Sequence, residues 1–284
     1  MKEDRPSATA QRVAMLRAAH QLLDDPKVFD DPVALRIIGR ESASALQADP
    51  RQFEATPLSS YLRAFVAARS RYAEDELSLG VRRGIRQYVI LGAGLDTFGY
   101  RNPYPEGMLH VFEVDHPTTQ TWKQARLEEV GIRFPGDLTF APVDFETQTL
   151  EEGLRSAGYD PEKGTFFSWL GVTEYLTTGV VMATLRFIAS APVGSGVVFD
   201  YMIPPSLLTS VQRLGLDVLS RRAAFAGEPW QAFFDPEVLA KDLRAMGFGY
   251  VEDKGQEEIN AMYFKNRKDG LQTGSLSHLM NAQV

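Results

Sequence analysis

The stretch "RQYVILGAGLDTFGYR", residues 86–101, decides the fold of this chain. Its apolar run at 88–91 is typical of a buried parallel strand, and the run stops at two glycines, Gly92 and Gly94. Glycines directly after such a strand allow a tight turn in which the backbone can approach a ligand closely. The stretch therefore predicts an α/β fold with a ligand site at this turn, although the same glycines could serve the turn alone.

Strands and helices alternate after residue 86, which is the pattern of a doubly wound, mostly parallel sheet. Each expected strand is a short apolar run, and each expected helix carries apolar residues at three-and-four spacing. The strands are expected at 87–92, 109–114, 138–143, 165–170 and 196–202, with helices at 118–130, 148–157 and 178–191.

One domain accounts for the whole chain, because no repeat or low-complexity linker divides it. Amphipathic patterns at 8–23 and 58–81 predict helices before the core. The stretch after the last core strand is too long for a simple connector, and its apolar residues predict helix. The expected parts are a helical cap (1–85), the cofactor-binding core (86–204), a helical lid insertion (205–234) and a terminal segment (235–284).

The terminal segment is expected to add a hairpin to the edge of the sheet. Residues 235–254 predict a last helix and one strand, and residues 259–267 predict a second strand. From Asp269 onward the chain is polar, and we expect a loosely ordered tail.

Composition excludes several classes of function. A net charge of −7 and a pI near 5.3 argue against a nucleic-acid partner, which needs a dense basic surface. The absence of cysteine excludes disulfides and thiolate catalysis and suits a reducing cytoplasm, and the four histidines show no metal-ligand spacing. No apolar run approaches the roughly 20 residues of a membrane span. We therefore expect a soluble cytoplasmic protein without a metal, a membrane anchor or a nucleic-acid partner; the sequence indicates no oligomeric state.

The chemistry of the glycine turn favours one cofactor over another. A dinucleotide fold has Gly-x-Gly-x-x-Gly, but the third position here is Thr97. The neighbouring Asp96 would repel a pyrophosphate, whereas it would tolerate or hold an ammonium group. S-adenosylmethionine, a nucleoside with a positively charged tail, therefore fits the turn better than NAD.

Acidic residues end the next two expected strands. Asp115 follows the turn by about 20 residues, the position from which a carboxylate binds ribose hydroxyls. Asp144 and Phe145 follow the third strand, where an acceptor and an aromatic face could bracket an adenine. Both aspartates are also good helix N-caps, so a capping role stays open for each.

Six motif blocks, taken in order, resemble the leucine carboxyl methyltransferase-like family of S-adenosylmethionine-dependent O-methyltransferases, in particular its bacterial members. The blocks are "SRYAEDEL", "VILGAGLDTFGYR", "VFEVDHP", "VDFE", "WLGVTEYLT" and "FDYMIP". They lie within residues 60–205, and the rest of the chain resembles the family only loosely. The resemblance implies a class I methyltransferase-like Rossmann fold.

The resemblance also implies cofactor-binding roles for single residues. Each role concerns one part of S-adenosylmethionine. Arg71 would pair with the methionyl carboxylate, Gly92 and Gly94 would line the tail, Asp115 would bind the ribose, and Asp144 with Phe145 would hold the adenine.

One block departs from the family pattern. Many relatives carry an acidic residue directly after the tryptophan of "WLGVTEYLT", where this chain has Leu170, and we transfer no role to Glu174. Three aromatic residues near the expected cleft are candidates for contact with the substrate, although aromatic residues there more often belong to the core. They are Tyr175, Tyr201 and Trp230.

We therefore expect an O-methyltransferase that modifies a carboxylate or a hydroxyl of a small-molecule metabolite. A carboxylate is already an anion at pH 7 and needs no base, whereas a phenol with a pKa of about 10 needs one, for which His116 is the nearby candidate. An NAD(P)-dependent oxidoreductase and a non-catalytic nucleoside-binding protein are the alternatives. The insertion at 205–234 is expected to cover the acceptor pocket together with the N-terminal helices.

Overall fold

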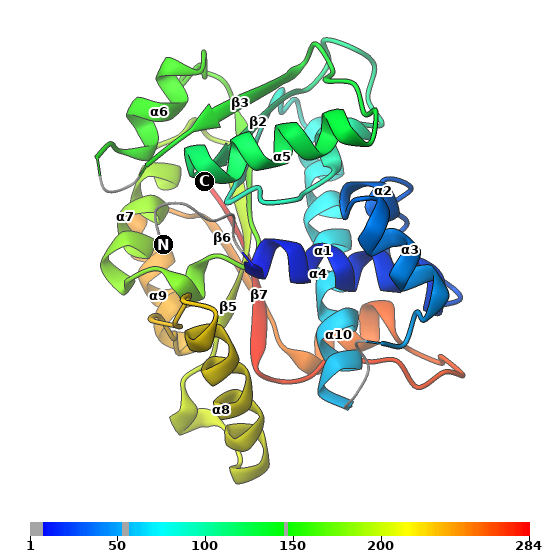
Figure 1. Cartoon of the computed structure of the whole chain (residues 1–284). Helices are drawn as coiled ribbons and strands as arrows, with labels where there is room; N and C mark the ends of the chain where they lie inside the picture. The colour runs from blue at the N-terminus through cyan, green and yellow to red at the C-terminus, as the bar shows by residue number, and fades with distance from the viewer. Residues whose placement is uncertain (1–7, 53–56, 145–146) are drawn as a thin grey trace.

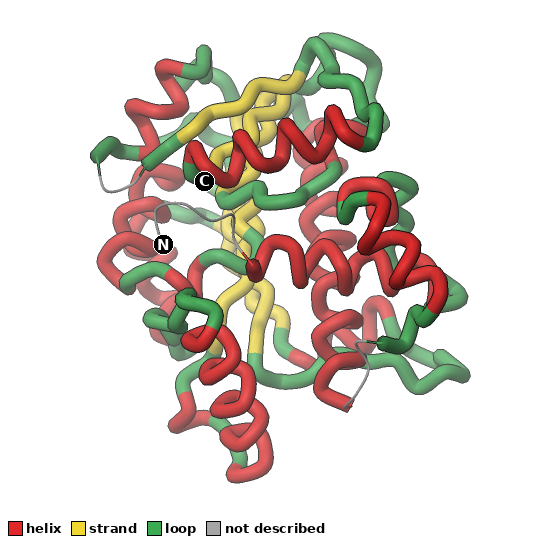
Figure 2. The backbone as a smooth tube through the Cα atoms, viewed as in Figure 1, coloured by secondary structure: helices red, strands yellow, loops and turns green. Residues whose placement is uncertain are grey.

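A seven-stranded sheet runs through the molecule, with helices on both of its faces (Figures 1 and 2). The structure is a computed structural model that describes residues 8–52, 57–144 and 147–284. The strand order is β3-β2-β1-β4-β5-β7-β6, in which the first five are parallel and the last two join antiparallel. The parallel strands are β1 (Gln87–Leu91), β2 (His110–Asp115), β3 (Leu138–Pro142), β4 (Thr165–Trp169) and β5 (Gly196–Met202).

The observed strands confirm the doubly wound, mostly parallel sheet, each within about a residue of its expected bounds. Side chains of β1 alternate between two buried faces: Val89 and Leu91 lie in one core cluster, and Tyr88 and Ile90 lie in the other. Because both faces are covered, the strand reads as a continuous apolar run rather than an alternating one.

Helices on one face of the sheet are α6 (Leu150–Ser156), α7 (Thr178–Ala189) and α9 (Pro236–Met246), which pack in one core cluster. The other face carries α4 (Pro57–Arg82) and α10 (Gln256–Tyr263). Beside α4 lie α5 (Pro117–Glu129) and the first three helices, which share a third cluster. These three are α1 (Ala8–Leu23), α2 (Ala34–Ile37) and α3 (Arg40–Ala48).

The end of the chain differs from the sequence-based expectation. Residues 259–267, expected as a strand, begin within helix α10, whose Ile259 is buried in the core. The hairpin partner of β6 (Tyr250–Lys254) is β7 (Ser277–Gln283), which lies in the expected loose tail. Strand β7 pairs with β5 along seven positions, so the tail is an inner strand of the sheet. The polar appearance of the tail misled the prediction, because Leu279 and Met280, consecutive residues that face opposite cores, are both fully buried and His278 is hydrogen-bonded to Asp253.

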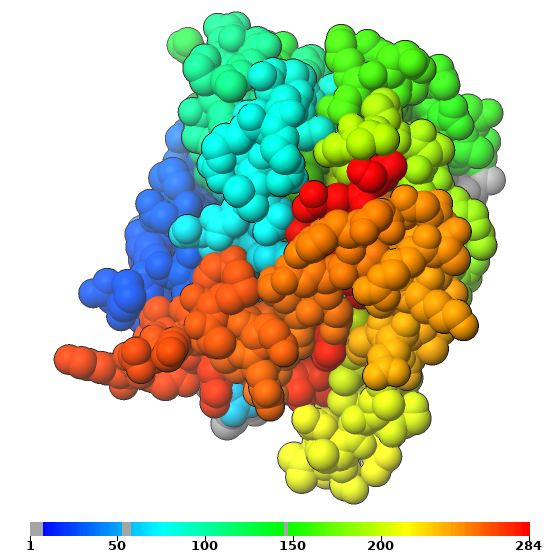
Figure 3. Space-filling view, turned by 180° about the vertical axis from the view of Figure 1, so that it is seen from behind, coloured from blue at the N-terminus to red at the C-terminus, as the bar shows by residue number. Residues whose placement is uncertain are grey.

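The segment after β5 forms the expected helix and projects from the body of the molecule. Helix α8 (Ser210–Phe225) begins at a capping box between Thr209 and Gln212. Figures 1 and 3 show it extending away from the sheet at one end of the molecule. Within residues 8–52, 57–144 and 147–284, no helix combines the length and apolar character needed to cross a bilayer.

Candidate functional site

The turn after β1 has a backbone that only glycine adopts readily. Gly92 has φ +65° and Gly94 has φ +45°, both in the left-handed region. A Cβ atom on Gly92 would lie 2.4 Å from Val172 Cγ2, and one on Gly94 would lie 3.1 Å from the Cβ of Ala10. The turn is therefore in close contact with the segment after β4 and with α1, and a side chain would push either away.

Asp115 is joined directly to this turn. Its Oδ2 accepts a hydrogen bond from the Gly94 backbone N–H at 2.6 Å, and its Oδ1 accepts one from the His116 N–H at 2.7 Å. Burial raises the pKa of Asp115, against the lowering effect of these two hydrogen bonds. The carboxylate thus lies at the carboxyl end of β2 beside the glycine turn, the arrangement that the sequence predicted for a ribose-binding acid.

Of the three other predicted cofactor contacts, two lie near the same edge of the sheet and one lies outside the described residues. Asp96 accepts a hydrogen bond from the Phe98 N–H at 2.8 Å, so it shapes the 3-10 turn at Phe98–Tyr100. Asp144 follows β3, and its carbonyl accepts hydrogen bonds from residues 147 and 148. Phe145 lies outside the described residues, so its predicted role stays a prediction.

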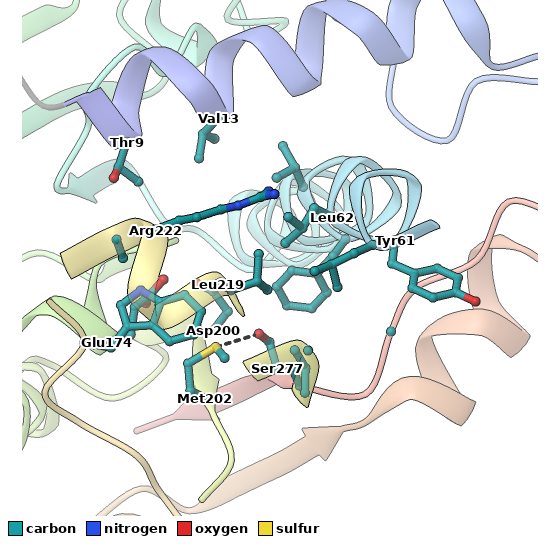
Figure 4. Close-up of a pocket in the computed structure, with 18 of the residues that line it drawn as sticks. Thr9, Val13, Tyr61, Leu62, Glu174, Asp200, Met202, Leu219, Arg222 and Ser277 are labelled. Carbon is teal, nitrogen blue, oxygen red and sulfur yellow. Dashed lines mark hydrogen bonds between the residues drawn. The ribbon is translucent and has the colours of Figure 1, made fainter. Parts of the chain in front are cut away.

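A cavity of about 670 Å³ opens beside this edge of the sheet. Its walls come from α1, α4, the segment 174–175, the end of β5, helix α8 and residues 274–277. Figure 4 shows Thr9 and Val13 of α1 on one side of the cavity, with Glu174 and Met202 opposite. Residues of the insertion and of the N-terminal helices line this cavity together, and the expectation that they cover an acceptor pocket stays a prediction. Most of the lining side chains are apolar.

The cavity adjoins the glycine turn through two short segments. Val172, which packs on Gly92, is two residues before Glu174 in the cavity wall. Ala10, which packs on Gly94, is flanked by the wall residue Thr9. A ligand at the turn would therefore lie next to a molecule in the cavity.

The structure places the two arginines of "ARSRY" on different sides of α4. Arg71 faces outward, with its side chain 49% exposed and its Nε 2.8 Å from Asp75 Oδ1. Arg69 lines the cavity, and its Nη1 lies 2.7 Å from Asp200 Oδ2. The predicted place of Arg71 beside the cofactor is thus corrected: helical geometry turns residues two apart to different faces, and the buried arginine is Arg69.

Glu174 is the cavity residue that the sequence analysis set aside. It is only 8% exposed, and its Oε2 is fully buried and has no hydrogen-bond partner in the part of the chain that the structure describes. Burial, together with the negative charge of Asp200 and against the positive charge of Arg69, raises the pKa of Glu174 to about 8. A buried carboxyl group with a perturbed pKa in a cavity is typical of a functional site.

The three aromatic candidates have different places. Tyr175 and Trp230 line the cavity, and burial raises the pKa of Tyr175. Tyr201 is instead buried in the core, where its hydroxyl donates to Asp253 Oδ1 at 2.7 Å. Its expected position in the cleft is corrected, because alternate side chains of β5 point to opposite faces and Asp200, not Tyr201, faces the cavity.

Two arginines face the cavity without a partner. Arg12 lies on α1 and Arg222 on α8, and among the described residues neither guanidinium forms an ion pair. Burial lowers the pKa of Arg12, and the positive charge of Arg222 lowers it further. Figure 4 shows Arg222 reaching from α8 into the space between α1 and α4. The described residues include no group of three or more acidic, histidine or cysteine side chains that could hold a metal ion.

Comparisons with known proteins agree with this architecture. Residues 10–189 match the family model of leucine carboxyl methyltransferase. The chain is 33% identical over 302 residues to the "Putative S-adenosyl-L-methionine-dependent methyltransferase YktD" of Bacillus subtilis, and the match covers 99% of each protein. A similarly named protein of Mycolicibacterium smegmatis is 35% identical over 179 residues, which cover 60% of this chain and 57% of that protein.

Solved structures share the fold at low identity. A "putative methyltransferase" of Thermobifida fusca has a TM-score of 0.56 and 16% identity, covering 99% of this chain and 96% of its own. A "duf574 family protein" of Streptomyces avermitilis has a TM-score of 0.54 and 14% identity, covering 94% of this chain and 96% of its own. The fold is that of the class I S-adenosylmethionine-dependent methyltransferases.

The chain belongs to the leucine carboxyl methyltransferase family. It is an S-adenosylmethionine-dependent methyltransferase, and S-adenosylmethionine is its cofactor. The residues present fit this group: both glycines of the turn have the left-handed backbone that side chains rarely adopt, and an acid lies beside the turn at the end of β2.

Proposed function

We propose that the enzyme is an O-methyltransferase that acts on a carboxylate or hydroxyl oxygen of a small, largely apolar molecule. The observation that carries this proposal is the cavity of about 670 Å³, which adjoins the glycine turn and has mostly apolar walls. This volume falls in the range of about 300–1,000 Å³ that is typical of small-molecule sites. The acceptor is therefore a metabolite-sized molecule rather than a nucleic acid or a membrane.

The residues beside the turn are assigned to the cofactor. Gly92 and Gly94 would line its tail, Asp115 would bind the ribose hydroxyls, and Arg69 would pair with the methionyl carboxylate in place of Arg71. When bound, S-adenosylmethionine supplies a methyl group on a positively charged sulfur. The task of the protein is to hold the acceptor oxygen in line at about 3 Å and to exclude water.

The walls of the cavity indicate what kind of acceptor enters. Leu62, Phe65 and Leu219 offer apolar surface to the body of the molecule. Arg12 and Arg222 have no anionic partner among the described residues, so they would stabilise a negatively charged group on the acceptor.

The absence of cysteine suits a reducing compartment, and a cytoplasmic location stays a prediction.

A binding experiment and a turnover experiment test the proposal. S-adenosylhomocysteine is expected to raise the melting temperature while NADH does not, because a ligand that binds the folded state stabilises it by mass action. Methyl-labelled cofactor is then incubated with a panel of organic acids and phenols, and transfer to an oxygen is expected. Stabilisation by NADH alone would favour an oxidoreductase, and binding of S-adenosylhomocysteine without transfer to any compound would favour a nucleoside-binding protein.

A further inference from the structure

We propose that Glu174 is the catalytic base of this enzyme and that the methyl acceptor is accordingly a hydroxyl group, as in a phenol or alcohol with an apolar body. This inference rests on the proposed function and goes further, because it selects one of the two kinds of acceptor oxygen. Two observations support it: the position of one buried carboxyl group, and the lack of a hydrogen-bond partner for one of its oxygens among the described residues.

Glu174 lies where an acceptor would meet it. The residue ends the short segment after β4 and lines the cavity, two positions after the valine that packs on Gly92. Its backbone carbonyl accepts hydrogen bonds from the N–H groups of Gln231 at 2.6 Å and Ala232 at 3.4 Å. The segment therefore packs on the glycine turn through Val172 and is hydrogen-bonded to the insertion through Glu174. These contacts hold the carboxyl group between the turn and the insertion.

The other acid of the cavity is already satisfied. Asp200 accepts from Arg69 at 2.7 Å and from the Gly171 N–H at 2.5 Å. Glu174 Oε2, in contrast, has no hydrogen-bond partner among the described residues. A buried acceptor atom without a donor costs free energy, and a ligand that supplies the donor recovers it. A hydroxyl group carries such a proton, whereas a carboxylate acceptor carries none at neutral pH.

The charges around Glu174 favour an uncharged acceptor oxygen at this position. Asp200 on β5 adds negative charge, Arg69 on α4 adds positive charge that Asp200 largely neutralises, and the neighbouring Tyr175 is uncharged at neutral pH because burial raises its pKa. The hydrogen bond that favours the charged form of Glu174 comes from its own backbone N–H. In the charged form that can accept a proton, Glu174 would repel a second carboxylate, while it would bind a hydroxyl.

The proton balance of the step is complete. The acceptor oxygen forms a bond to the methyl carbon and gives its proton to Glu174. The bond between that carbon and the sulfur breaks, and its electron pair stays on the sulfur, which becomes neutral. Glu174 then releases the proton to solvent. A base with a pKa near the working pH suits this role, and burial raises the pKa of Glu174 to about 8.

The experiment uses acceptors that carry both kinds of oxygen. Para-hydroxycinnamic acid and an omega-hydroxy fatty acid are incubated with labelled cofactor, and the products are separated into ethers and esters, since mild alkali cleaves only esters. We expect ethers. Esters as the main product would overturn the role of Glu174 and leave the proposed function standing, whereas no transfer to either oxygen would count against the proposed function itself.

Substitution separates catalysis from binding. Glu174→Gln is expected to lower kcat/KM by about 100-fold or more and to abolish its rise toward pH 8, because amides do not accept protons at this pH. Calorimetry should show S-adenosylhomocysteine binding within about threefold of wild type, which also confirms folding. Glu174→Asp should restore part of the activity. The exposed Glu162→Gln is the matched control. If Glu174→Gln weakens S-adenosylhomocysteine binding as much as it lowers turnover, the residue binds the cofactor and the proposal is wrong.

Discussion

Arg69 Nη1 lies 2.7 Å from Asp200 Oδ2, although 131 positions separate the two residues in the chain. The pair joins α4 to the carboxyl end of β5, and both side chains are almost completely buried. Asp200 also accepts a hydrogen bond from the Gly171 N–H, which fixes the segment that follows β4. One ion pair therefore connects three elements around the floor of the cavity.

Replacing Arg69 should have far larger effects than replacing Arg71. Arg69→Met leaves a buried carboxylate unpaired, so we expect a loss of about 3–5 kcal/mol in the free energy of unfolding and loss of S-adenosylhomocysteine binding. Arg71→Met removes an exposed pair with Asp75 and should cost at most about 0.5 kcal/mol. Chemical denaturation and calorimetry measure both quantities.

The double variant Arg69→Met/Asp200→Asn controls for the unpaired charge. It should recover stability but not cofactor binding. Recovery of binding in the double variant, or an equal loss of binding in Arg71→Met, would contradict the assignment of Arg69 to the methionyl carboxylate.

Asp115→Asn should weaken both the cofactor site and the turn. The carboxylate accepts two backbone hydrogen bonds, and an amide can accept only through its single carbonyl oxygen. We expect S-adenosylhomocysteine to bind about 1–3 kcal/mol more weakly, with a loss of about 1 kcal/mol in stability. Unchanged affinity with reduced stability would leave Asp115 a purely structural role.

Trp230→Ala should change the affinity for the acceptor and not that for the cofactor. Trp230 lines the cavity from the insertion, whereas the two glycines of the turn pack on Val172 and Ala10. Steady-state kinetics with an acceptor that the enzyme methylates should show a rise of about tenfold in the KM for the acceptor, which corresponds to about 1.4 kcal/mol. Phe225→Ala is the matched control, because Phe225 lies in the same insertion, at the end of α8, and is exposed. Equal changes in both Michaelis constants would contradict this role.

The Glu174→Gln variant should gain stability relative to wild type as pH rises. A carboxyl group whose folded pKa is about 8, above the ordinary 4.5, binds its proton more tightly in the folded state. The free energy of unfolding of the wild type therefore decreases as the pH rises through these two values. The Glu174→Gln variant has no group that titrates here, so it lacks this decrease. We expect the unfolding free energy of the variant minus that of the wild type to grow by about 1–4 kcal/mol between pH 5 and pH 9.

A second buried acid provides an internal check on that measurement. Burial raises the pKa of Glu113 to about 7 even though Lys123 lies 2.6 Å away. This group titrates in wild type and variant alike, so it cancels in the difference. A difference that stays constant with pH would show that Glu174 is not held in its protonated form.

The parallel half of the sheet could be predicted from sequence because its signal is local. Residues 88–91 form a continuous apolar run that ends in glycines, and each later parallel strand is a short, mostly apolar run. Strand β7 has no such signal. Asn281 and His278 interrupt its apolar residues, and they are accommodated only because β5 and β6 pair with the strand on both sides.

The candidate site was predictable to the extent that strand order determines it. Gly94 and Asp115 had to meet, because β1 and β2 are adjacent parallel strands. The orientation of Arg69 relative to Arg71 depends on how α4 packs on the sheet, which amphipathic spacing alone did not resolve. The burial of Glu174 depends on contacts with residues 231 and 232, more than fifty positions further on, and no motif in the sequence records them.

The position of β7 also sets the order in which the molecule can be assembled as it is synthesised. The strand follows every other element in sequence, yet it lies between β5 and β6. Until residues 277–283 leave the ribosome, β5 has an open edge and β6 has no neighbour, which are conditions that favour association between nascent chains. The preceding residues 274–277 complete a wall of the cavity. The growing chain can therefore form its cofactor edge early, but it can enclose an acceptor only after residues 274–277 have been translated.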